Sequence, residues 1–165
     1  MNINPDDEEA DYALFGMVLL QWGHIEAELI NLLLRLTHPL FGFSDEKGLP
    51  PAFSRQIRLA KHLYRDIPQM AELKDVACTL LDTLGPLHKT RSVIIHRYYQ
   101  RYTASDRFMF GIFGRQGPRM VNKFHYFTHA QIAQLSSDIE DRRANMAILS
   151  ADTFRVPLPK ARRGG

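Results

Sequence analysis

Residues 15–36, FGMVLLQWGHIEAELINLLLRL, contain the apolar pattern that decides the fold of this chain. Large apolar residues recur there at alternating intervals of three and four positions, the period of an amphipathic helix with one buried face. The members of this stripe are Phe15, Val18, Trp22, Ile25, Leu29, Leu32 and Leu36. Pro5 and the acidic residues 6–9 suit a first helical turn, because carboxylates interact favourably with the positive end of the helix dipole. The pattern predicts a helix from about Asp7 to Leu36.

Two more helical segments follow this first one. Proline and glycine residues within 37–51 indicate a loop, after which the sequence predicts a short helix over 52–65. A longer helical pattern covers about 69–99, and Gly85-Pro86 is expected to kink or divide it. The tail from Phe154 onward is rich in proline and basic residues and is expected to be frayed.

The character of the sequence changes between Asp106 and Phe127. Aromatic and β-branched residues flank the glycine-rich segment 114–118, which predicts a β-hairpin. Thr128 can then cap a last helix that ends near Leu149. We therefore expect a mainly α fold, an antiparallel bundle of four to five helices with a small β-hairpin before the last helix.

Length and composition favour a single helical domain over residues 1–150, followed by a basic tail over 151–165. Cys78 is the one cysteine, so an intrachain disulfide is excluded, and the acidic N-terminus lacks the basic start of a secretory signal. No apolar stretch reaches the roughly 20 residues of a membrane-spanning helix. We expect a cytoplasmic protein that has no membrane anchor.

Charge is distributed unevenly along the chain. Residues 1–50 have a net charge of −7 and residues 51–165 a net charge of +10. Between Lys89 and Lys123 eight basic residues stand against one acidic residue. Such a segment attracts phosphate if it forms one surface, but a solvated basic face without a ligand is an equally good interpretation.

Arg91 interrupts the apolar stripe of the long helix, where the spacing requires a core residue. A buried guanidinium is costly unless a carboxylate, a phosphate or an aqueous cleft satisfies it. Glu26 borders the stripe of the first helix, so an internal Arg91–Glu26 ion pair is one prediction. A phosphate ligand is the other.

Ser92 and His96 are four residues apart and share a helical face, with Lys89 and Tyr99 extending the same polar strip. Arg91 and His96 are five apart, roughly 140° around an ideal helix. Only the long Arg91 side chain, a distortion of the helix or a second subunit can bring the two groups to one substrate. An ordinary surface histidine is the competing interpretation.

The segment from Arg91 to His96 resembles the R-x4-6-H signature of the HEPN superfamily of helical ribonucleases and toxins. An opening helix with Trp22 and Glu26, a long helix ending in the motif, a short insertion and a closing helix agree with it. The resemblance implies a metal-independent endoribonuclease that acts as a homodimer, with the motifs of two subunits forming one cleft. It further implies a toxin or phage-defence effector, held in check by an antitoxin or nucleotidyltransferase partner.

The resemblance assigns roles to particular residues. His96 becomes the general acid or base, Arg91 binds the scissile phosphate, and Ser92 fixes either of them. Phosphates and bases of RNA are then expected to contact a second group of residues, Lys89, Arg97, Tyr99 and Arg101. Ser92 stands where the family commonly has Asn, and Arg97 where many members have Gly, which puts the orientation of the phosphate in question.

Other site types are not expected. His125 and His129 are separated by the predicted start of the last helix, so we predict no metal site and no cofactor. Besides the nuclease, two hypotheses stay open. One is a non-catalytic HEPN-like module that binds nucleotides, nucleic acid or a protein. The other is an interaction domain in which the acidic first helix of one chain meets the basic half of another.

Overall fold

The structure is a computed structural model that describes residues 5–41, 48–96, 98–102, 107–116 and 119–159. Its helices are α1 (Pro5–Leu36), α2 (Phe53–Asp66), α3 (Lys74–His96) and α4 (His129–Arg155), with short 3-10 turns at Pro39–Phe41 and Pro68–Met70. Its strands are β1 (Tyr98–Tyr102), β2 (Arg107–Gln116) and β3 (Arg119–Thr128). The mainly α fold with a β-hairpin before the last helix is confirmed.

The chain forms two compact units. The first contains Met1–Trp22 and Pro86–Glu140, and the second contains Gly23–Gly85 and Asp141–Gly165. The helices α1, α3 and α4 therefore each contribute residues to both units. No helix in the described ranges is long and apolar enough to cross a membrane.

The first unit is built on an antiparallel sheet with strand order β1-β2-β3. Phe108 and Phe110 of β2 are buried, and the Phe15 ring of α1 packs edge-on against both, at 5.5 and 5.8 Å between ring centres. A buried hydrogen bond of 2.9 Å from Ser136 Oγ to Gln21 Oε1 also joins α4 to α1. Three consecutive residues of β2, Phe108, Met109 and Phe110, are thus buried in this unit.

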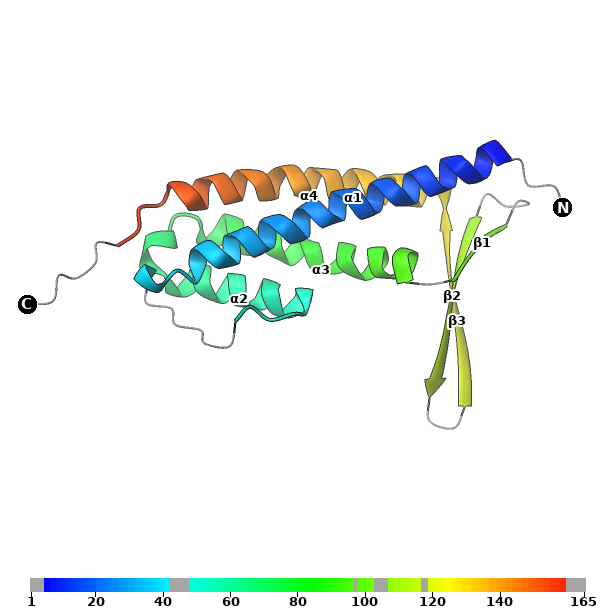
Figure 1. Ribbon diagram of the computed structural model, residues 1–165, viewed down its shortest axis with the longest axis horizontal. Helices are drawn as coiled ribbons and strands as arrows, with labels where there is room; N and C mark the ends of the chain where they lie inside the picture. The colour runs from blue at the N-terminus through cyan, green and yellow to red at the C-terminus, as the bar shows by residue number, and fades with distance from the viewer. Residues whose placement is uncertain (1–4, 42–47, 97, 103–106, 117–118, 160–165) are drawn as a thin grey trace, which may run out of the picture. The chain divides into compact units, whose positions relative to one another are not determined.

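The second unit is a helical bundle. Figure 1 shows that α3 runs opposite to α1 and α4 within this unit. Leucine and isoleucine side chains from all four helices form its buried core, including Leu29, Leu32, Ile57, Leu63, Leu81, Leu84 and Leu149. The period of three and four predicted for the first helix therefore identifies its buried face correctly.

Both predicted boundaries of the long helix are wrong. The helix expected over 69–99 begins at Lys74, after the 3-10 turn Pro68–Met70, and ends at His96. Residues 98–102 are instead strand β1, in which Tyr99 pairs with Phe110 and Arg101 with Phe108. The aromatic residues of this segment favour an extended backbone. The backbone groups of residues 98–102 pair with the edge of β2, which takes the place of hydrogen bonds within a longer helix. Tyr99 consequently does not extend the polar strip of the helix on which the sequence placed it.

The last helix is longer than expected. Thr128 caps it as predicted: its hydroxyl accepts the Gln131 backbone N–H at 3.1 Å, and Gln131 Oε1 accepts the Thr128 N–H at 2.8 Å. The helix continues to Arg155 instead of ending near Leu149. Arg35 explains the added turn, because its Nη2 donates to the Val156 carbonyl at 2.6 Å and its guanidinium carbon lies 5.6 Å from the Phe154 ring centre.

Tyr64 makes a buried polar contact in the second unit. Its hydroxyl lies 2.5 Å from Thr153 Oγ1, and Thr153 donates its own proton to the Leu149 carbonyl at 2.7 Å, so Tyr64 is the donor of the first bond. Burial of the Tyr64 phenol raises its pKa from 10.0 to about 12. The folded state therefore holds the phenolic proton more tightly than the unfolded state.

This pKa predicts a loss of stability at high pH. The contribution of Tyr64 is complete below pH 10 and falls as the pH rises from 10 to about 12, because the unfolded chain loses the proton first. The full effect is roughly 2–3 kcal/mol, from two pKa units. Urea unfolding at several pH values should show this extra loss in wild type and not in Tyr64→Phe. Identical pH dependence of the two proteins would contradict the assignment.

Candidate functional site at the end of α3

Arg91 lies in the last turns of α3 and is half-buried. Its guanidinium carbon is 6.0 Å from the ring centre of Trp22, which is fully buried. The Nε atom of Arg91 is buried and has no hydrogen-bond partner among the described residues. An unsatisfied charged donor is costly, so this position favours an external acceptor.

His88 shares the Trp22 ring with Arg91. The His88 and Trp22 ring centres are 5.6 Å apart and the rings are inclined by 34°. Because His88 precedes Arg91 by three residues and Ser92 by four, all three lie on one face of α3. His88 was not among the residues expected from the sequence, although its spacing from Arg91 could have revealed it. The structure thus brings together Trp22, His88 and Arg91.

The other residues of the predicted motif lie near this cluster in the chain. Ser92 is half-buried and Lys89 is exposed. His96 is the last residue of α3, but its side chain and the whole of Arg97 lie outside the described residues. The catalytic pairing of Arg91 with His96 therefore stays a prediction.

Tyr99 and Arg101 belong to β1, not to the helix that carries Arg91. Their backbones pair with Phe110 and Phe108, and their side chains lie outside the described residues. Glu26 is a half-buried residue of α1 in the second unit, whereas Arg91 belongs to the first. The Arg91–Glu26 ion pair and the RNA contacts of Tyr99 and Arg101 stay predictions.

Two aromatic side chains of β3 are exposed in the same unit. Phe124 and Tyr126 are two residues apart in the strand and so share one face of the sheet. Arg107 is exposed, and together with Tyr126 and Gln131 it lines a small pocket of about 210 Å³. Solvent-facing aromatic rings beside a basic group can stack unpaired bases and hold phosphate. The sequence analysis predicted Tyr99 as the aromatic contact to RNA and did not predict Phe124 or Tyr126.

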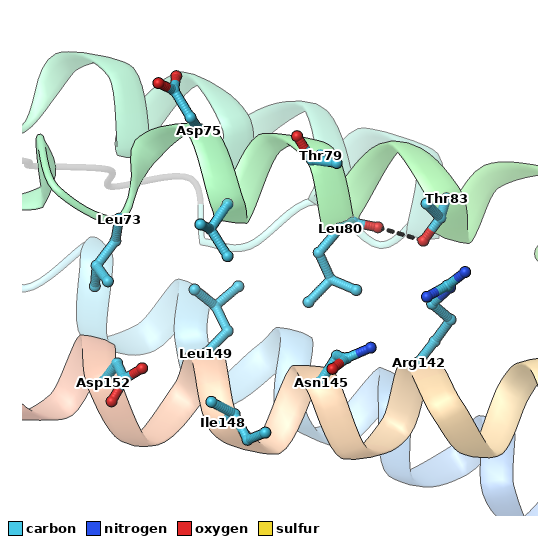
Figure 2. Close-up of a pocket in the computed structure, with 11 residues that line it drawn as sticks. Leu73, Asp75, Thr79, Leu80, Thr83, Arg142, Asn145, Ile148, Leu149 and Asp152 are labelled. Atoms are coloured by element: carbon cyan, nitrogen blue, oxygen red, sulfur yellow. Dashed lines mark hydrogen bonds between the residues drawn. The ribbon is translucent and has the colours of Figure 1, made fainter.

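The second unit contains a groove between α3 and α4, shown in Figure 2, with a volume of about 560 Å³. Its middle is apolar, with Val76, Leu80 and Leu149 among the lining residues. Arg142 lies toward one end of this groove and Asp152 toward the other. None of the residues expected from the sequence to act on RNA lines it.

The chain matches no protein-family model, and it is significantly similar to no curated protein and to no solved structure. The resemblance to the HEPN superfamily therefore rests on the residues of α3 and their surroundings alone.

Proposed function

We propose that this chain is a metal-independent endoribonuclease of the HEPN type, with its site at the end of α3. The observation that carries the proposal is the buried Arg91 Nε, which has no hydrogen-bond partner in the described part of the chain. A phosphate oxygen is the acceptor that best satisfies a guanidinium, because it accepts two parallel charge-assisted hydrogen bonds. Arg91 on the Trp22 ring is thus suited to hold an RNA phosphate.

The chemistry assigned to this site needs only protein groups and water. His96 removes the proton of the ribose 2'-hydroxyl while water protonates the leaving 5'-oxygen, or His96 protonates the leaving oxygen while water accepts the 2'-hydroxyl proton. The 2'-oxygen forms a bond to phosphorus while the bond from phosphorus to the 5'-oxygen breaks, and Arg91 stabilises the charge that develops on the phosphate. The products are a 2',3'-cyclic phosphate and a 5'-hydroxyl end. Ser92 positions His96 or the phosphate.

RNA outside the scissile bond follows exposed side chains of the first unit. Lys89 and Arg107 are exposed there, as are Phe124 and Tyr126. These groups attract the backbone and stack unpaired bases, and Arg97, Tyr99 and Arg101 are proposed to add to them. We further propose that the protein acts in the cytoplasm as a homodimer, in toxin or phage-defence biology, under control of an antitoxin or nucleotidyltransferase.

The direct test is cleavage of a mixed-sequence RNA in EDTA. Wild type should cut it and leave 2',3'-cyclic phosphate ends, whereas His96→Ala should be slower by about 100-fold or more. His62→Ala is the matched control, since His62 is an exposed helical histidine of the other unit. Cleavage that requires a divalent cation, or a fully active His96→Ala, would reject the proposal.

A second candidate function is a non-catalytic binding module, which the groove between α3 and α4 favours. Its apolar middle and oppositely charged ends suit an amphipathic segment of a protein partner. This alternative predicts that the RNA stays intact in the cleavage assay with EDTA. Any binding of RNA should then weaken as the salt concentration rises.

A further inference from the structure

A small pocket lies within the first unit, at the junction of β3 and α4. Its volume is about 210 Å³, and the residues that line it are Arg107, Tyr126, Phe127, Thr128 and Gln131. Arg107 pairs with Thr128 across the two strands, and Met109 pairs with Tyr126. Because successive residues alternate between the two faces of a strand, Arg107 and Tyr126 are diagonal neighbours on one face of the sheet. One ligand can therefore contact both side chains.

Arg107 brings hydrogen-bond donors to this pocket. Its side chain is exposed, and no hydrogen bond or ion pair joins it to another residue in the described part of the chain. A guanidinium has five N–H donors in a rigid plane and no acceptor. The described residues that line the pocket include no carboxylate. A ligand that fits Arg107 must therefore offer two neighbouring acceptor atoms.

Gln131 has a fixed orientation because it belongs to the cap of α4. Its Oε1 accepts the backbone N–H of Thr128 at 2.8 Å, and its own backbone N–H donates to Thr128 Oγ1 at 3.1 Å. Only the oxygen of the side-chain amide can accept an N–H, so the assignment of Oε1 and Nε2 follows from this contact. The amide group Nε2 is thus left as a second donor for a ligand in the pocket.

Tyr126 gives the pocket an aromatic wall. It is 53% exposed, and Phe127 lines the pocket beside it. Solvent-facing aromatic rings stack on unpaired bases, whereas a bare phosphate gains nothing from such a ring. The volume of about 210 Å³ is smaller than that of a typical pocket for a whole small molecule, roughly 300–1,000 Å³. The pocket is therefore suited to a single base.

We propose that this pocket binds an unpaired guanine base of single-stranded RNA. The Hoogsteen edge of guanine presents two neighbouring acceptors, N7 and O6, which an arginine contacts bidentately. Adenine has a donor beside N7, cytosine has a donor at N4, and uracil offers only the O4 acceptor on that edge. Arg107 contacts N7 and O6, Gln131 Nε2 donates to O6, and the Tyr126 ring stacks on the base. The pocket thus adds selectivity for one base to the general attraction of RNA in this unit.

Titration of the full chain with 2'-O-methyl RNA pentamers tests the proposal, because these RNAs lack the 2'-hydroxyl that cleavage requires. A uridine pentamer with one central guanosine should bind roughly ten-fold more tightly than pentamers with a central adenosine, cytidine or uridine. A central inosine should bind as tightly as guanosine, because inosine retains both N7 and O6. Equal affinity for all five pentamers would overturn the proposal.

Two further ligands distinguish the possible sources of binding. Inorganic phosphate should not displace the guanosine pentamer, and displacement by phosphate would identify an anion site instead of a base site. Guanosine monophosphate should compete but bind more weakly, because the flanking nucleotides of the pentamer also contact exposed groups such as Phe124. Binding of the free nucleotide as tight as that of the pentamer would reject RNA as the ligand.

Gln131→Glu tests the pocket without removing the helix cap, because glutamate accepts the Thr128 N–H in the same way. The substitution replaces the Nε2 donor with a carboxylate oxygen that repels O6, so the preference for guanosine should disappear while the circular dichroism stays unchanged. Arg107→Lys should also lose the preference, since lysine lacks the bidentate fork. Gln134→Glu is the control, because Gln134 is an exposed glutamine of the same helix that does not line the pocket. A Gln131→Glu chain that still prefers guanosine, or an equal loss in Gln134→Glu, would overturn the proposal.

This inference does not rest on the proposed nuclease activity, because no RNA is cut in these measurements. A preference for guanosine without RNA cleavage leaves the pocket standing, whereas a chain that cleaves RNA but binds all pentamers equally overturns the pocket alone.

Discussion

Arg91→Lys is expected to cleave RNA roughly 100-fold more slowly than the wild-type chain, because removing one transition-state donor commonly has that effect. Lysine retains the positive charge but lacks the planar fork that meets two phosphate oxygens at once. The guanidinium also lies 6.0 Å from the Trp22 ring, a contact that a rotating ammonium reproduces poorly. Single-turnover cleavage at saturating protein measures the chemical step directly.

Arg142→Lys is the matched control for this experiment. Arg142 is also half-buried, but it lines the groove of the second unit, so its replacement should leave the cleavage rate unchanged. The free energy of unfolding of Arg91→Met adds a second test. If Arg91 had a structural role, this substitution would lower that free energy. Because Arg91 Nε is buried without a hydrogen-bond partner in the described chain, Met should retain or raise the free energy of unfolding by about 1 kcal/mol. A clear loss of stability in Arg91→Met would identify Arg91 as a structural residue.

Trp22→Ala is expected to lower the free energy of unfolding by about 3–5 kcal/mol, the usual cost of removing a large aromatic ring from a core. Trp22 is fully buried, and both His88 and Arg91 pack against its ring. Trp22→Phe keeps part of the ring and should cost less. Urea unfolding followed by far-UV circular dichroism measures the difference, since Trp22 is the one tryptophan available for fluorescence.

Val76→Ala is the control for Trp22→Ala, because Val76 is 64% exposed and its truncation should change stability by no more than about 0.5 kcal/mol. An effect of Trp22→Ala as small as that of Val76→Ala would show that the ring is not part of the core. Folded Trp22→Phe should also cleave RNA more slowly, since the Arg91 guanidinium loses the larger ring beneath it.

Local patterns predicted much of the fold. The period of the stripe that includes Val18, Ile25 and Leu32 identified the buried face of α1, and Thr128 formed the expected cap of α4. These features depend on interactions between residues about one helical turn apart, so they can be predicted from the sequence alone.

The candidate site was predicted only in part. The position of Arg91 in a core stripe was visible because it breaks a regular period. Its contact with Trp22, which is 69 residues away in the chain, was not visible. The position of His88 three residues before Arg91 was visible in the sequence, but the ring contact of His88 with Trp22 was not. The exposed Phe124 and Tyr126 could not be distinguished from the buried Phe108 and Phe110 by composition, because the choice depends on which face of the sheet meets Phe15.

The sequence by itself determined that this chain is mainly helical, where α1 and α2 lie, and that a β-hairpin precedes the last helix. Only the tertiary structure decided that α3 ends at His96, that residues 98–102 join the sheet as β1, and that α4 extends to Arg155. The physical reason is the range of the interactions. Helical periodicity and capping depend on residues a few positions apart, so they can be recognised in the sequence. The pairing of β1 with β2 and the contact of Arg35 with Val156 join separate elements of the chain, and no local sequence pattern predicts them.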